Sequence, residues 1–152
     1  MLKINIVCVG NIKEKFFNMA CDEYIKRLGR FCNINVIEVK EQTEYENIEQ
    51  IKSLEGKDIL KYIKGFCVVM DIQGKNQDST QFANFIQETS NNFSEISFVI
   101  GGSYGVCESV KNRADFKLSF SKMTFPHMLF RVMLLEQIYR AFTINNNIKY
   151  HK

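Results

Sequence analysis

The sequence predicts an α/β fold, with a mostly parallel sheet and helices on both of its faces. Five short apolar segments alternate with five segments of helical periodicity, the pattern of parallel strands joined by crossover helices. Two of the apolar segments are continuous runs, which is typical of strands covered on both faces. The chain has 152 residues, 45% hydrophobic and 24% charged, as in an ordinary folded domain. We therefore expect a single domain over residues 1–152.

The first strand is expected at Leu2 to Val9, with Gly10-Asn11 as the turn after it. The segment from Lys15 to Leu28 is predicted to form an amphipathic helix, and Gly29 is predicted to end it. The apolar residues of this helix recur at every fourth position: Phe16, Ala20, Tyr24 and Leu28.

A second, β-branched strand is expected at Ile34 to Val39. Thr43 and Glu46 have the spacing of a capping box, so a second helix should begin there and continue to Tyr62. The third strand, Phe66 to Ile72, is continuously apolar, and we expect it at the centre of the sheet.

The second half of the chain repeats the alternation of helices and strands. Ser79 is predicted to cap the third helix, and a buried strand follows at Ile96 to Ile100. A short helix at Val106 to Arg113 and a short strand at Phe116 to Phe120 come next. The last helix is predicted from His127 to about Ile144, because the preceding proline suits the first turn of a helix.

The charge and apolar runs limit the classes of function. A net charge of +3 and a pI near 8.6 suit a polyanionic partner but do not require one. The densest apolar run, Met128 to Leu135, is interrupted by Arg131 and is far shorter than the ~18 residues of a membrane span. The apolar start of the chain lacks the cleavage site of an export signal. We expect a cytoplasmic protein that is not embedded in a membrane.

The cysteine pattern predicts reduced thiols and no metal site. The five cysteines occur singly, without a C-x-x-C pair and without histidines at the spacing of a zinc finger. Cys8 and Cys67 lie within apolar runs, where a thiol behaves as a small core residue.

Three polar or glycine-rich segments follow predicted strands: Asp71 to Asn76, Gly101 to Gly105 and Ser121 to His127. Ligands of parallel α/β sheets bind at the carboxyl ends of strands, so these segments are the candidate binding loops. The glycines would let the backbone approach a nucleotide closely. The loop from Phe120 to His127 could wrap a flat ring. An ordinary turn and a packed connection are the structural alternatives, and composition alone leaves them open.

Residues near the carboxyl terminus could supply acid–base groups and cations. His127 opens a helix, Arg140 lies in that helix, and Tyr150 and His151 come almost last in the chain. A packing role for His127 and a solvated, frayed tail are the alternatives.

Taken together and in this order, the motifs of the chain resemble those of the ribosomal RNA large subunit methyltransferase H family. The resemblance covers nearly the whole chain and rests on Asp71 to Lys75, Ile100 to Gly105, Phe120 to His127, Glu136 to Ala141 and Tyr150 to Lys152.

The resemblance implies an α/β methyltransferase domain of the SPOUT class, with a carboxyl-terminal trefoil knot that holds S-adenosylmethionine. It also implies a homodimer that methylates N3 of a pseudouridine in large-subunit (23S) ribosomal RNA within the assembled ribosome, without a metal. The knot rests on the resemblance alone, because general rules of chain topology disfavour knots.

The resemblance also assigns site residues by position. Arg140, Tyr150 and His151 are the predicted catalytic residues: Arg140 would hold a phosphate or a carbonyl oxygen, and His151 or Tyr150 would assist removal of the N3 proton. Met70 replaces an expected leucine of similar volume. The predicted cofactor-binding residues are Met70, Gly101, Phe120, Ser121, Lys122, Met123, Thr124 and Phe125.

Two other functions fit the same loops. A non-catalytic nucleotide- or RNA-binding module would need the strand-end loops but not the terminal residues. A SPOUT enzyme that acts on transfer RNA would have the same cofactor pocket.

Overall fold

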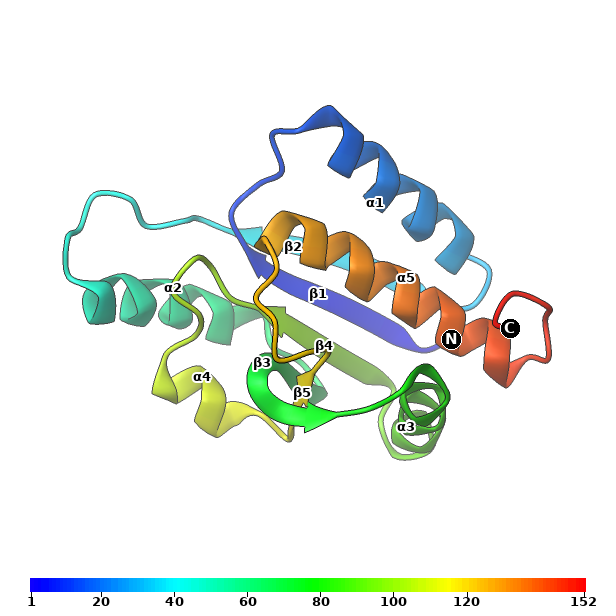
Figure 1. The fold of residues 1–152 in the computed structure, drawn as a ribbon. Helices are drawn as coiled ribbons and strands as arrows, with labels where there is room; N and C mark the ends of the chain where they lie inside the picture. Colours follow the sequence, from blue (N-terminus) through cyan, green and yellow to red (C-terminus); the bar gives the residue numbers. More distant parts are fainter.

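A parallel sheet with the strand order β2-β1-β4-β3-β5 forms the middle layer of the protein (Figure 1). The computed structural model describes residues 1–152, and every neighbouring pair of strands is parallel. The predicted α/β fold class is therefore confirmed. The strands are β1 (Lys3–Val9), β2 (Asn33–Val39), β3 (Phe66–Asn76), β4 (Glu95–Ile100) and β5 (Phe116–Ser119).

The helices cover both faces of the sheet, as the continuous apolar strands predict. Helices α1, α3 and α5 pack together on one face, and α2 and α4 on the other (Figure 1). The helices are α1 (Lys15–Leu28), α2 (Ile48–Tyr62), α3 (Ser79–Asn92), α4 (Glu108–Arg113) and α5 (His127–Asn145).

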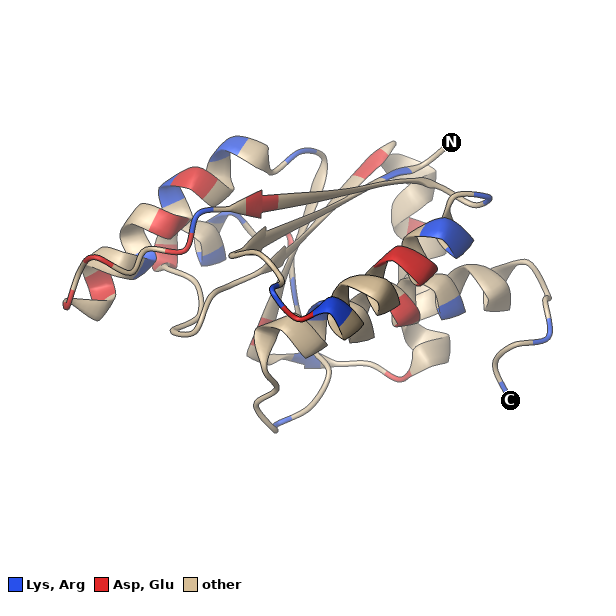
Figure 2. Cartoon of the chain, turned by 90° about the horizontal axis from the view of Figure 1, so that it is seen from above, with Lys and Arg blue, Asp and Glu red and all other residues tan.

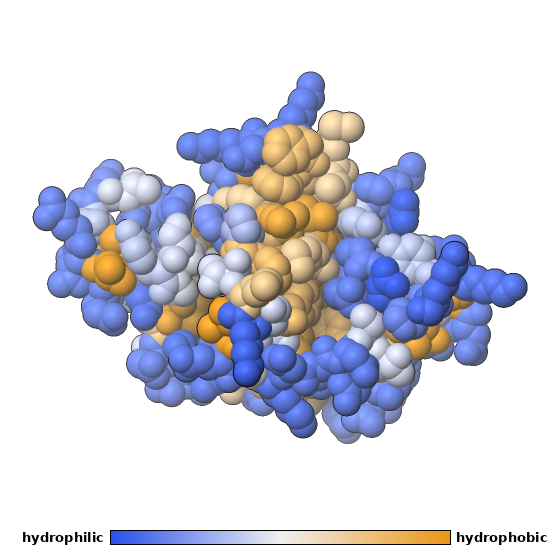
Figure 3. Space-filling model, in the orientation of Figure 1, coloured by the Kyte–Doolittle hydropathy of each residue, from blue (hydrophilic) through white to orange (hydrophobic).

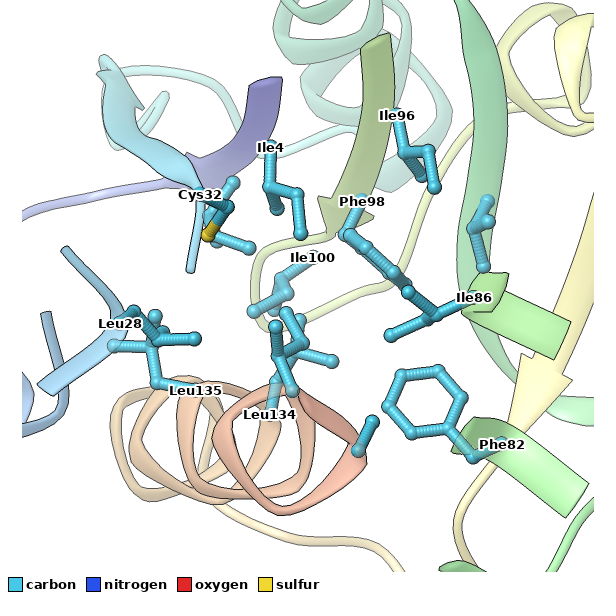
Figure 4. Close-up of a cluster of buried hydrophobic side chains, with 14 of the residues drawn as sticks. Ile4, Leu28, Cys32, Phe82, Ile86, Ile96, Phe98, Ile100, Leu134 and Leu135 are labelled. Carbon is cyan, nitrogen blue, oxygen red and sulfur yellow. The ribbon is translucent and has the colours of Figure 1, made fainter. Parts of the chain in front are cut away.

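The larger core lies between the sheet and the helices α1, α3 and α5. Successive side chains of a strand point to opposite faces. In β1, accordingly, Ile4 and Ile6 belong to this core, and Val7 belongs to the smaller core under α2 and α4. Figure 4 shows Leu134 of α5 and Phe82 of α3 meeting the strand residues in the larger core.

The prediction that the third strand lies at the centre of the sheet is wrong. The middle position belongs to β4, which pairs with β1 on one side and β3 on the other. Apolarity could not distinguish the two, because each is buried between helical layers. The short β5 pairs with the outer side of β3 and forms an edge of the sheet.

The predicted caps of two helices are also wrong. Helix α2 begins after Asn47, whose side chain accepts a hydrogen bond from the Gln50 amide at 3.0 Å, so Thr43 lies outside the helix. Helix α3 is capped by Asp78 and not by Ser79. Ser79 donates instead to the side chain of Gln137 on α5, at 2.8 Å.

Helix α1 has the predicted bounds and ends before Gly29, as predicted. Gly29 follows its last residue in a right-handed conformation, with φ of −56°. Phe16 belongs to the predicted apolar stripe of this helix, yet 65% of its surface is exposed.

The cysteines are free thiols, and Cys8 and Cys67 lie in the cores as predicted. Burial raises the pKa of Cys8 to about 12 and that of Cys67 to about 11, so both stay protonated near neutral pH. None of the helices combines the length and the apolarity that crossing a membrane requires.

Candidate active site

The carboxyl ends of β3, β4 and β5 border a pocket with about 620 Å³ of empty space. Half of the sixteen residues that line it are hydrophobic, which suits a ligand with a flat apolar part. The structure brings together all but one of the predicted cofactor residues here: Met70, Gly101, Phe120, Ser121, Met123, Thr124 and Phe125. Lys122 is the exception; it is exposed and borders a neighbouring hollow beside Gly74.

The glycine turn after β4 forms one wall of the pocket. The Gly105 amide donates to the Gly102 carbonyl at 3.0 Å, and Gly105 has a positive φ of 81°. A Cβ atom at Gly101 would lie 2.8 Å from the carbonyl carbon of Gly105, so a side chain would push the turn apart. Glycine at these positions keeps the backbone close to the pocket.

An irregular segment within β3 forms the opposite wall. The pairing of β3 with β5 shifts between Met70 and Lys75, so the four residues between them bulge out of the sheet. The Asp71 carboxylate accepts a hydrogen bond from the Gln73 amide at 3.0 Å and shapes this bulge. The sequence indicates a turn here, but the strand continues beyond it to Asn76.

The loop between β5 and α5 forms the floor and rim. The Ser121 hydroxyl accepts a hydrogen bond from the Met123 amide at 3.0 Å, which curls the loop. The ring centroid of Phe120 lies 5.0 Å from that of Phe130, so Phe120 packs against α5 while it lines the pocket. Met123 is 72% exposed at the rim. Phe120 therefore fits the packed-connection alternative, and the binding of a ligand by this loop stays a prediction.

The predicted catalytic residues cluster around one carboxylate halfway along α5. Glu136 Oε1 accepts from Arg140 Nε at 2.9 Å and Nη2 at 2.5 Å, and from the Tyr150 hydroxyl at 3.2 Å. Arg140 Nη1 lies 3.2 Å from His151 Nδ1. The Arg140 guanidinium also lies over the Tyr150 ring, 4.8 Å from its centroid.

These contacts separate the roles of Tyr150 and His151. Burial, a hydrogen bond with Tyr24 and the charge of Glu136 together raise the pKa of Tyr150 to about 12. Tyr150 is therefore a hydrogen-bond donor at neutral pH and a poor base. Since an arginine can only donate, His151 Nδ1 accepts in this arrangement, and the Nε2–H is left to donate.

The structure does not bring this cluster to the pocket within one chain. The pocket includes His127 and Phe130 of α5, whereas Arg140 lies ten residues beyond Phe130 on the same helix. A helix rises 1.5 Å per residue, so about 15 Å separates Phe130 from Arg140 along the helix. A second hollow beside α5 is bordered by Phe120, which also lines the pocket, and by Glu136 of the tail cluster.

Comparison with known proteins places the chain in a family. Residues 2–151 match the family described as "Predicted SPOUT methyltransferase". The chain belongs to the SPOUT methyltransferases. A SPOUT relative from Caldicellulosiruptor saccharolyticus, named Ribosomal RNA large subunit methyltransferase H, is 48% identical over 98% of this chain and 99% of its own length. A relative of the same name from Clostridium botulinum is 50% identical over 99% of this chain and all of its own.

Two solved structures have a fold similar to that of this chain at low sequence identity. A probable methylase family protein from Haemophilus influenzae has a TM-score of 0.56 at 13% identity, over 98% of this chain and 70% of its own. The tRNA (m1G37) methyltransferase from Aquifex aeolicus has a TM-score of 0.55 at 14% identity, over 91% of this chain and 69% of its own. At these identities the likeness concerns the fold alone.

Sequence reasoning missed one central residue of this SPOUT domain. Glu136 accepts from both Arg140 and Tyr150, and from the Gln137 side chain at 2.9 Å. Its position four residues before Arg140 on a helix is the spacing at which a carboxylate and a guanidinium meet, so the signal was present. No group of three or more histidine, cysteine, aspartate or glutamate side chains in the structure is arranged to hold a metal ion.

Proposed function

We propose that this SPOUT protein transfers a methyl group from S-adenosylmethionine to N3 of a pseudouridine in large-subunit (23S) ribosomal RNA, acting on the assembled ribosome in the cytoplasm. The observation that carries the proposal is the identity of about 50% over full length with relatives named for large-subunit ribosomal RNA methylation. The trefoil knot of the class stays a prediction for this chain.

The pocket residues fit S-adenosylmethionine in their chemistry. Met70, Leu118 and Phe125 offer apolar surfaces to an adenine ring, and the glycine turn offers backbone groups without side chains in the way. When bound, S-adenosylmethionine supplies an electrophilic methyl group on a positively charged sulfur.

The residues around Glu136 would bind the target base and stabilise the charge that develops on it. Glu136 holds the Arg140 guanidinium in a fixed orientation, so Arg140 is able to bind a phosphate or a carbonyl oxygen. The N3 proton would pass to a solvent water. The Nε2–H of His151 would donate to a carbonyl oxygen beside N3, which stabilises the negative charge left on the base until the N3 lone pair takes the methyl group. In this proposal Tyr150 orients Glu136 and Arg140 and takes no proton.

The distance along α5 supports a homodimer, in which the tail of one subunit serves the pocket of its partner. Helix α5 carries Leu129 at its start, 36% exposed, with half-buried Val132 and Met133 in the next turn. On α1, Phe16 and Met19 are each 65% exposed. Figure 3 shows an apolar band that runs from the beginning of α1 across the beginning of α5. A second copy of the chain would bury this band.

Transfer of labelled methyl from S-adenosylmethionine tests the proposed reaction. The acceptors are ribosomes, free ribosomal RNA and transfer RNA from cells that lack this protein. We expect label in large-subunit RNA of ribosomes alone, recovered after digestion as N3-methylpseudouridine. Label on transfer RNA would overturn the substrate, and no label despite cofactor binding would favour the non-catalytic binding module.

A further inference from the structure

Two exposed arginines lie over aromatic rings where α1 ends. The guanidinium carbon of Arg27 lies 5.4 Å from the ring centroid of Tyr24 and 5.6 Å from that of Tyr139 on α5. Arg30, one turn later, lies 5.0 Å from the centroid of Phe31. Both side chains are exposed, so their donor groups face solvent. The rings hold each guanidinium in place without neutralising its charge.

These rings are continuous with the tail cluster. Tyr139 meets the Tyr150 ring edge-on, with 4.9 Å between the centroids. Phe31 stacks on Phe142 of α5, with 5.5 Å between centroids and an interplanar angle of 6°. The aromatic rings between α1 and α5 thus connect Arg27 to the tail cluster: Arg27 lies over Tyr139, and Arg140 lies over the neighbouring ring of Tyr150.

The charge at this end is predominantly positive. Figure 2 shows Lys and Arg at the end of α1, in the turn after it and along the carboxyl-terminal tail, all at one end of the molecule. Lys26, Lys149 and Lys152 are exposed there. Asp22 and Glu23 are the acidic residues of α1, and Glu23 pairs with Arg27 at 3.4 Å. This exposed pair is weak, so a stronger anion can take the guanidinium from Glu23.

We propose that Arg27 and Arg30 form a phosphate-binding face for the RNA strand whose target base reaches Arg140 and His151. The inference rests on the proposed function, because it requires an RNA substrate at the tail cluster. Planar guanidinium groups donate two parallel hydrogen bonds to a phosphate, and prior immobilisation on rings lowers the entropy lost on binding.

An RNA partner fits this face better than an acidic protein does. The face lies next to Arg140 and His151, which would hold the target base. An RNA strand with its base at these residues must place its flanking phosphates over the adjacent surface, which includes Arg27 and Arg30. Phosphates occur at every nucleotide and release counterions when neutralised, so each such contact has a measurable salt dependence.

The double variant Arg27→Gln and Arg30→Gln tests the face with binding and turnover measured separately. We expect the KM for ribosomes to rise roughly tenfold or more, and the slope of log affinity against log salt to become shallower by about 2. The kcat at saturating ribosomes and the Kd for S-adenosylmethionine should equal those of wild type, because the cofactor pocket is at the other end of α5. The matched control is the double variant Lys57→Gln and Lys61→Gln on α2, which also removes two exposed positive charges, one of them paired with a carboxylate.

The variant Glu23→Gln tests the same face by an expected fall in the KM for ribosomes, where the arginine variant is expected to raise it. This second test does not depend on correct folding of the arginine variant. Freeing Arg27 from its carboxylate should lower the KM for ribosomes roughly two- to threefold. Unchanged KM values and salt slopes in both the arginine and the Glu23 variants would overturn the proposal that this face binds RNA phosphates. So would a loss of binding to polyglutamate without a loss of binding to ribosomes. Failure of the wild-type enzyme to methylate any RNA would instead overturn the proposed reaction, and direct ribosome-binding curves would still test this face.

Discussion

Glu55 is a buried carboxylate on α2 beneath the glycine turn. Only 3% of its surface is exposed, and Oε2 accepts from the Gln42 amide at 3.0 Å. Its other oxygen lies 3.1 Å from the position that a Cβ atom of Gly102 would take. Burial raises the pKa of Glu55; the Gln42 hydrogen bond opposes this rise and the charge of Glu41 adds to it.

The raised pKa predicts how stability depends on pH. Folding favours the protonated form of Glu55, so this group contributes most below its unfolded-state pKa, and the contribution is lost as pH rises through the folded-state pKa. We expect Glu55→Gln, which keeps an acceptor for Gln42, to gain unfolding free energy relative to wild type as pH rises from the unfolded-state pKa of about 4.3 to the raised folded-state pKa. Urea unfolding across this range measures the difference. A difference independent of pH would contradict the prediction.

Glu136 offers a second prediction at the residue scale. Glu136→Gln keeps the size of the side chain but removes the charge that holds Arg140, so we expect kcat to fall roughly tenfold to a hundredfold. The Kd for S-adenosylmethionine should not change, since Glu136 does not line the pocket and lies about 9 Å along α5 from Phe130, the nearest pocket residue on that helix. Turnover assays and calorimetry separate the two effects. A change in cofactor affinity equal to the change in kcat would show that Glu136 acts through the fold.

Among the elements, β3 depends most on a single glycine. A Cβ atom at Gly74 would lie 2.7 Å from the carbonyl carbon and oxygen of Lys117 on β5, and 2.9 Å from the Asp71 carbonyl oxygen. These neighbours are backbone atoms of the bulge and the edge strand, so a methyl group there must displace one of them.

Gly74→Ala is therefore expected to destabilise the protein by about 1–3 kcal/mol. It should also weaken cofactor binding, because the bulge forms a wall of the pocket. Gly29→Ala is the matched control: its Cβ atom would lie at an ordinary 3.4 Å from the Lys26 carbonyl oxygen, in a right-handed conformation. Chemical unfolding and calorimetry report both quantities, and equal behaviour of the two variants would refute the role assigned to the bulge.

The elements also show where sequence patterns suffice. Strand-helix alternation predicts the ten elements and their parallel pairing, because hydrophobic periodicity is a property of each segment. The caps differ because several neighbouring residues suit a cap, and packing selects Asn47 over Thr43. The bulge at Gly74 depends on the approach of β5, a distant segment, and local sequence cannot reveal that approach.

At the scale of the whole molecule, the site is predictable in its parts but not in its arrangement. The rule that ligands bind at strand ends is enough to locate Gly101 and the Phe120 to Phe125 loop at the pocket. The distance between His127 and Arg140 follows from the length of an unbroken α5, yet motif order alone suggests a single cluster. Only the three-dimensional arrangement raises the question of which subunit of the proposed homodimer supplies the tail.

Mixed dimers answer that question. One variant, Thr124→Trp, would fill the pocket from its exposed rim, and the other would lack Tyr150 to Lys152. Each alone should be inactive. If tails act on the partner's pocket, a mixed dimer contains one pocket that is open and faces an intact tail.

Random pairing of the two variants makes half of the dimers mixed, so co-expression should restore about one quarter of wild-type methyl transfer. Two affinity tags isolate the mixed dimer and confirm its composition. Each variant mixed with wild type controls for the exchange of subunits. A purified mixed dimer without activity would mean that the tail serves its own chain, and α5 would then have to bend or the tail unfold to cover the distance to the pocket.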